Sequence, residues 1–88
     1  MNEILLDGTT ITSMTEIHRT LADALSFPEW YGGTLDALHD CLCELSENTC
    51  IALRHTDELS EILGPAFPRL CRVLLNSAEE NPYLKIQL

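Results

Sequence analysis

Two aspartates four residues apart, Asp36 and Asp40, are the residues of this sequence best placed for chemistry. On a helix, that spacing puts both carboxylates on one face. Glu44 and Glu47 continue the row of acids by steps of four and three. A solvated face would ordinarily carry Lys or Arg among its acids, but residues 20–53 contain six acids and neither basic residue. Such an unneutralised row can bind a strongly basic partner, and a solvent-exposed face without a ligand is the alternative.

The same segment is a weak candidate for a metal or catalytic site. Asp36, His39 and Asp40 could form a metal site or an acid–base pair, but side chains 39 and 40 point about 100° apart on a helix. The four cysteines lack the CxxC spacing typical of zinc sites. No Cys–His pair in the sequence has an identifiable third catalytic group. We therefore predict no metal, no cofactor and no enzymatic activity.

A loop rich in aromatic residues and glycine, residues 27–33, precedes the predicted acidic helix. Trp30 and Tyr31 are residue types that dominate binding interfaces, although lone aromatics in small domains also anchor loops on the core. We expect one ring to pack inward and the other to be exposed. Gly32 and Gly33 permit a positive φ or close backbone approach. A phosphate-binding role is excluded, because the loop lacks the GxxxxGK[ST] pattern and its acids would repel the anion.

Length and charge limit the classes of function. The chain has 88 residues, so we predict a single domain over residues 1–88. Its formal charge of −9 disfavours direct binding to nucleic acid or to an anionic membrane. A basic protein is the natural complement, although solubility alone also explains an acidic composition. We find no signal-peptide pattern and no apolar run near the roughly 20 residues of a membrane span. We expect a cytoplasmic protein with reduced cysteines that is monomeric when free.

Hydrophobic spacing and turn residues predict the elements that must position the acidic face. Strands are predicted over residues 3–6, 49–53 and 83–88, and helices beginning near residues 14, 35, 57 and 65. Ser13 to Glu16 has the form of a capping box, and Thr34 and Thr56 are predicted helix caps. The strand at 49–53 has the apolar run of a strand buried on both faces. Because helices separate the strands, the order β-α-α-β-α-α-β predicts a small parallel sheet in an α/β domain.

The run Pro28-Glu29-Trp30-Tyr31-Gly32, followed by residues 35–42 (LDALHDCL), resembles the core motif of the barstar family of ribonuclease inhibitors. The resemblance implies a barstar-like α/β fold with a small three-stranded parallel sheet packed by about four helices. It also implies that the second helix and the loop before it bind a ribonuclease active site. Asp40 matches the family aspartate that takes the place of an RNA phosphate, and Asp36 matches one that pairs with an enzyme arginine.

Other positions fit the family pattern less closely. Trp30 stands in place of an inhibitory tyrosine, and Thr34 stands in place of a contacting loop asparagine. His39 and Leu45 each replace a tryptophan, and Glu44 replaces a glycine of the contact patch. On the fourth helix, Asn76 stands in place of a family glutamate. The neighbouring Glu79 or Glu80 could substitute for that glutamate. These departures leave the identity of the ribonuclease open.

The leading hypothesis is therefore an inhibitor, or immunity protein, for a bacterial ribonuclease or ribonuclease-type toxin domain of basic charge. A barstar-like module that binds a basic protein other than a nuclease is the first alternative, and a small metal-dependent enzyme is the second. The predicted partner-binding residues are Trp30, Tyr31, Gly32, Thr34, Asp36, His39, Asp40, Cys43, Glu44 and Asn76.

Overall fold

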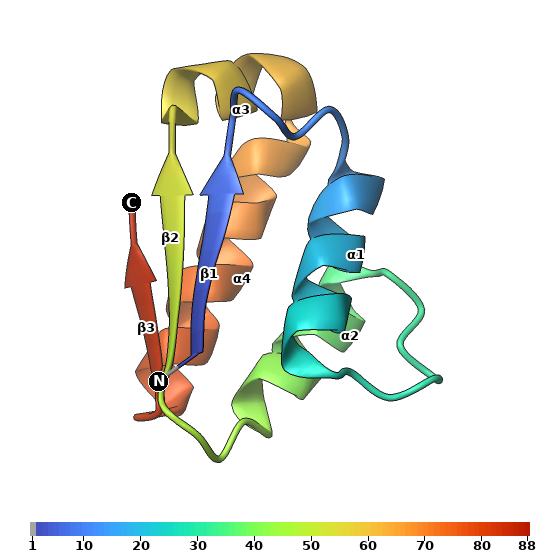
Figure 1. Cartoon of the computed structure of the whole chain (residues 1–88), viewed down its shortest axis with the longest axis vertical. Helices are drawn as coiled ribbons and strands as arrows, with labels where there is room; N and C mark the ends of the chain where they lie inside the picture. Colours follow the sequence, from blue (N-terminus) through green and yellow to red (C-terminus); the bar gives the residue numbers. More distant parts are fainter. Residues whose placement is uncertain (1) are drawn as a thin grey trace.

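The structure, a computed structural model, describes residues 2–88. Within them the chain forms three strands and four helices in the predicted order, which confirms the α/β fold class (Figure 1). The bounds are β1 Asn2–Asp7, α1 Met14–Leu25, α2 Leu35–Cys43, β2 Thr49–Arg54, α3 Thr56–Leu63, α4 Ala66–Glu80 and β3 Leu84–Gln87.

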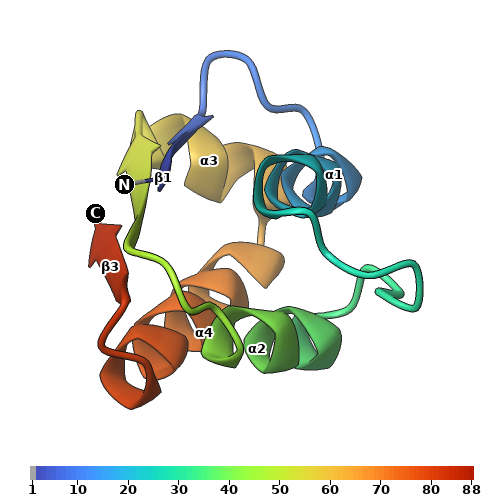
Figure 2. The same cartoon turned by 60° about the horizontal axis from the view of Figure 1, so that its bottom comes forward.

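The three strands form one parallel sheet with β2 in the centre. Ile51 of β2 pairs in register with Ile4 of β1 and Ile86 of β3. All four helices lie on the same side of this sheet (Figures 1 and 2). Strand residues that point toward the helices are therefore buried, and Leu5, which points the other way, is 54% exposed.

This one-sided architecture corrects the prediction that residues 49–53 are buried on both faces. Along β2, fully buried residues alternate with the half-buried Cys50 and Ala52. The hydrophobic run is continuous in sequence, but helices cover only one face of the sheet, so burial follows the two-residue period of a strand.

Helix starts agree only partly with the predicted caps. The Ser13 hydroxyl accepts from the Glu16 amide, but the Glu16 carboxylate pairs with the Thr12 hydroxyl instead of closing the capping box. Thr56 is the first residue of α3 and not its cap. Because β2 extends through Arg54, a single residue in a left-handed conformation, His55 with φ 54°, completes the turn into the helix.

One continuous core holds α2 against the rest of the domain. Its buried members come from every element and include Leu38 and Leu42 of α2, with Leu70 and Leu74 of α4. Helix α2 packs along α4, with the two helices side by side (Figure 2). Among residues 2–88, no helix has the length and hydropathy needed to cross a membrane.

Candidate functional site

The start of α2 is fixed by the residues that precede it. Gly33 has φ 70°, a left-handed conformation that glycine adopts readily, and it turns the loop toward the helix. Thr34 then takes the N-cap position, where its hydroxyl accepts from the Ala37 amide at 3.1 Å. The predicted cap is confirmed, and it places Asp36 in the first turn, where the helix dipole stabilises a carboxylate.

The acidic side chains of α2 are exposed, as the spacing predicts. Asp36, Asp40 and Glu44 all face solvent, and the Asp40 side chain is 71% exposed. None of the ion pairs formed among residues 2–88 brings a Lys or Arg to these carboxylates. We call these three residues the α2 acidic face. Glu44 is the C-cap residue of α2, whereas Glu47 lies beyond the cap in the connection to β2 and does not belong to this face.

The loop before α2 divides its two aromatic rings as predicted. Trp30 is 60% exposed, and Tyr31 packs edge-on against Phe27 with ring centroids 4.9 Å apart. The Tyr31 hydroxyl forms a hydrogen bond with Nδ1 of His18 on α1. Burial raises the pKa of Tyr31 to about 12 and lowers the pKa of His18, so both groups are neutral near pH 7. Tyr31 thus anchors the loop, while Trp30 and Gly32 are exposed to solvent.

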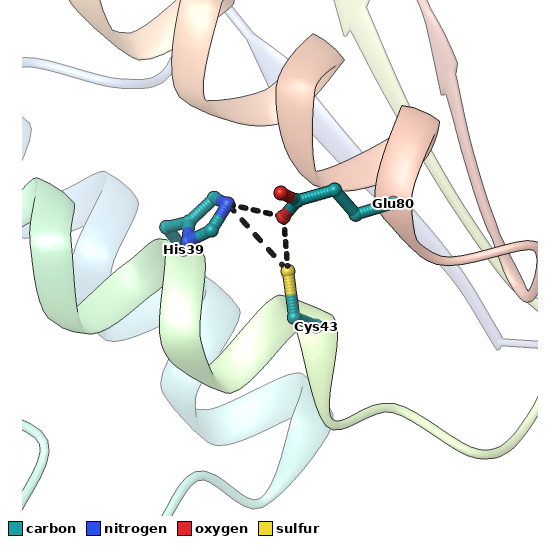
Figure 3. A group of neighbouring side chains, drawn as sticks. All are labelled: His39, Cys43 and Glu80. Atoms are coloured by element: carbon teal, nitrogen blue, oxygen red, sulfur yellow. Dashed lines mark hydrogen bonds and ion pairs between the residues drawn. The ribbon is translucent and has the colours of Figure 1, made fainter.

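Three side chains from α2 and α4 meet beside the α2 acidic face (Figure 3). Nε2 of His39 lies 2.7 Å from Oε2 of Glu80, and Sγ of Cys43 donates to the same oxygen at 3.2 Å. Sγ of Cys43 and Nε2 of His39 are 3.6 Å apart. Burial, followed by the interaction with Glu80, raises the pKa of the Cys43 thiol, while hydrogen bonds from Cys43 and His39 lower the pKa of Glu80.

This cluster, which we call the His39–Cys43–Glu80 cluster, was not predicted as a unit. Sequence spacing places His39 and Cys43 four apart on one helix, but Glu80 is 37 residues beyond Cys43 and joins them only through helix packing. The predicted contact residue Asn76 is exposed one turn earlier on α4, on the side of the helix that also carries Glu80.

Sequence reasoning also missed the residue that attaches α2 to the end of α4. Asn81 is 4% exposed, and its amide nitrogen donates to the carbonyls of Leu42 at 2.9 Å and Leu45 at 3.0 Å. Its side-chain oxygen accepts from the Tyr83 amide at 3.0 Å. The Asn81-Pro82 pair correctly predicts the end of α4, but nothing in that pattern indicates a partner 36 to 39 residues earlier.

Comparison with known proteins identifies the family of this chain. Residues 1–87 match the family model described as "Barstar (barnase inhibitor)". The chain belongs to the barstar family. Members of this family are inhibitors and not enzymes.

A curated relative agrees with the barstar assignment over part of the chain. A stretch of 42 residues is 45% identical to a protein of Bacillus subtilis (strain 168) named "Putative ribonuclease inhibitor YrdF". The match covers 48% of this chain and 46% of that protein, so it spans a little under half of the relative's length.

Proposed function

We propose that this barstar-family protein inhibits a ribonuclease by covering its basic active site with the α2 acidic face and the adjoining loop. The observation that carries the proposal is the exposed pair Asp36 and Asp40, which form no ion pair with a Lys or Arg among residues 2–88, together with the exposed Trp30 of the preceding loop. Carboxylates on a rigid helix can occupy the positions where an enzyme would otherwise hold substrate phosphates. A side chain that is already exposed and rigidly mounted needs little rearrangement to bind.

The charge of the whole chain supports the same proposal. A formal charge of −9 attracts a basic enzyme over several ångströms and speeds their encounter, so the association rate should fall as salt is added. We further propose that the enzyme is a bacterial ribonuclease toxin against which this protein confers immunity in the cytoplasm, acting as a monomer. The four cysteines are free thiols, which suits a reducing compartment.

Within the proposed interface, Asp40 is the anchor and Asp36 the second acidic contact. Trp30 is the exposed aromatic anchor, and Gly32, Thr34, His39, Cys43, Glu44 and Asn76 complete the predicted contact surface. Tyr31 is predicted to contribute indirectly, by holding the loop in place, because its hydroxyl is hydrogen-bonded to His18. Glu80 contacts His39 of α2, and we propose it as the substitute for the family glutamate that Asn76 replaces.

The direct test measures RNA cleavage and complex formation together. Barnase and any basic nuclease domain encoded beside this chain's gene are each mixed with the purified protein, and RNA cleavage and the dissociation constant are measured. Inhibition at stoichiometric concentration is expected for the cognate enzyme. Tight binding to a basic protein whose RNA cleavage is unaffected would overturn the inhibitor assignment.

Asp40→Ala is the decisive variant, with Glu61→Ala as its matched control. Losing one partner of a desolvated, hydrogen-bonded charge pair costs about 2 to 5 kcal/mol, a range that barstar complexes themselves helped to establish. We therefore expect the dissociation constant to rise by at least about 30-fold. Glu61 is an exposed acid on α3, at the opposite end of the molecule from α2 (Figure 1), so its loss changes net charge equally but removes no predicted contact. Equal effects of the two variants would show that net charge, and not Asp40, determines affinity.

A further inference from the structure

The His39–Cys43–Glu80 cluster presents three different ligand atoms to one point in space. An imidazole nitrogen, a thiol sulfur and a carboxylate oxygen lie within 4.8 Å of one another, and all three side chains point into the same gap between α2 and α4 (Figure 3). We propose that these residues form a binding site for a divalent transition-metal ion, with Zn²⁺ as the preferred ion.

The separations of the three atoms are close to those that zinc requires. With Zn–S of about 2.3 Å and Zn–N or Zn–O of about 2.0 to 2.2 Å, tetrahedral ligands stand about 3.6 Å (S to N), 3.6 Å (S to O) and 3.4 Å (N to O) apart. The Cys43 Sγ to His39 Nε2 distance is already 3.6 Å. Only the Glu80 oxygen, now 3.2 Å from the sulfur and 2.7 Å from the nitrogen, has to move, by less than about 1 Å.

The backbone on both sides of the site is fixed before any ion binds. Cys43 follows Leu42 directly, and Glu80 precedes Asn81, whose buried amide donates to the Leu42 carbonyl at 2.9 Å. That hydrogen bond holds the two ligand-bearing helix ends together. The Glu80 side chain itself is 61% exposed and the His39 side chain 35% exposed, so an ion can enter and the carboxylate can adjust its rotamer.

The ligand set favours zinc over the common hard cations. Mg²⁺ and Ca²⁺ select oxygen ligands, whereas a mixed sulfur, nitrogen and oxygen set suits Zn²⁺ and its neighbours in the transition series. Binding replaces the Cys43 thiol proton, which is released to solvent, and leaves a thiolate and a carboxylate whose two negative charges balance the ion. Three protein ligands leave a fourth position, which we assign to water.

Asp40 is placed to supply a supporting contact of the kind that metal-bound histidines usually have. Its Oδ1 lies 3.9 Å from Nδ1 of His39, the ring nitrogen that does not face the cluster. A small rotation brings the Nδ1–H group into a hydrogen bond with this carboxylate, which would fix the ring and its tautomer. The metal site does not rest on ribonuclease inhibition, because all of its ligands belong to this chain.

The test is titration of the reduced full-length chain with Co²⁺, followed by displacement with Zn²⁺. Co²⁺ should bind one ion per chain, give a thiolate-to-cobalt charge-transfer band and visible bands of four-coordinate intensity, and then lose these bands as Zn²⁺ replaces it. A parallel calorimetric titration with Zn²⁺ gives the affinity. The absence of the charge-transfer band, or six-coordinate bands only, would overturn the proposal.

Matched variants locate the ion. Cys43→Ser should abolish the charge-transfer band, and His39→Gln and Glu80→Gln should each weaken Zn²⁺ binding by at least about tenfold. Cys50→Ser is the control, because this half-buried thiol lies on β2, away from the cluster, and its loss should leave binding unchanged. Far-UV circular dichroism confirms that each variant is folded. A band that persists in Cys43→Ser and disappears in Cys50→Ser would refute the assignment.

Discussion

Replacing Asn81 with alanine should destabilise the protein through the loss of three hydrogen bonds. The side chain donates to the Leu42 and Leu45 carbonyls near the end of α2 and accepts from the Tyr83 amide before β3. Each bond contributes about 1 kcal/mol net; the bond to the Leu42 carbonyl is buried and the other two are part-buried. The Leu42 carbonyl keeps a second bond from the Leu45 amide at 3.3 Å, which reduces the loss. We therefore expect a decrease of about 2 to 3 kcal/mol in the free energy of unfolding.

That decrease is large for a domain of 88 residues, whose total stability should be about 4 to 13 kcal/mol. It corresponds to a fall of roughly 10 to 20 °C in Tm. Urea unfolding followed by far-UV circular dichroism is the appropriate measurement. Fluorescence is a poor probe here, because the only tryptophan, Trp30, is already 60% exposed in the folded state.

Two further variants separate the attachment of α2 from a general effect of mutation. Asn81→Asp keeps an acceptor for the Tyr83 amide but loses both bonds to the carbonyls at the end of α2 and places a carboxylate against them, so it should be destabilised at least as much as the alanine variant. Asn76→Ala, at an exposed position of α4, should change stability by less than about 0.5 kcal/mol. Wild-type stability in Asn81→Asp would refute the claim that the bonds to α2 carry the effect.

Three other predictions concern the loop before α2, the turn after β1 and the half-buried His18. Trp30→Ala should raise the rate of dissociation from the cognate ribonuclease by roughly 30-fold, which is equivalent to about 2 kcal/mol of binding free energy, and should change the association rate little. Stopped-flow measurements give both rates, and an unchanged dissociation rate would show that Trp30 does not contribute to the interface. Gly8→Ala should lower the free energy of unfolding, measured with urea, by about 1 to 3 kcal/mol or more. A Cβ at this position would lie 2.9 Å from the Leu59 amide nitrogen and closer still to the His55 carbonyl oxygen. Gly32→Ala, with no atom within 4 Å of the added carbon, is its control, and equal stability of the two variants would contradict this account. His18 has a lowered pKa in the folded state, so the unfolded chain binds this proton more readily, and wild-type stability should fall as pH drops below about 6.5. His18→Gln should lose that part of the pH dependence, and a parallel pH profile of stability for the two proteins would show that His18 does not cause it.

The sequence by itself was sufficient for the order of the elements and for the exposed face of α2. Apolar residues spaced three and four apart and the Asn81-Pro82 pair are local features, and they predicted the helices correctly. The spacing of Asp36 and Asp40 likewise determines that both side chains share a helix face. The division between exposed Trp30 and inward Tyr31 could be predicted as a pattern, but the residues alone did not decide which ring would be which.

Tertiary structure decided the contacts between residues far apart in the chain. Covering only one face of the sheet made burial alternate along β2, although its hydrophobic run is continuous. Packing of α4 along α2 brought Glu80 to His39 and Cys43, and it gave Asn81 its carbonyl partners. The spacing of residues along a helix determines which side chains share a face, but it does not indicate which residues of a second helix pack against that face. The ligand cluster and the attachment of α2 therefore exist only once the chain has folded.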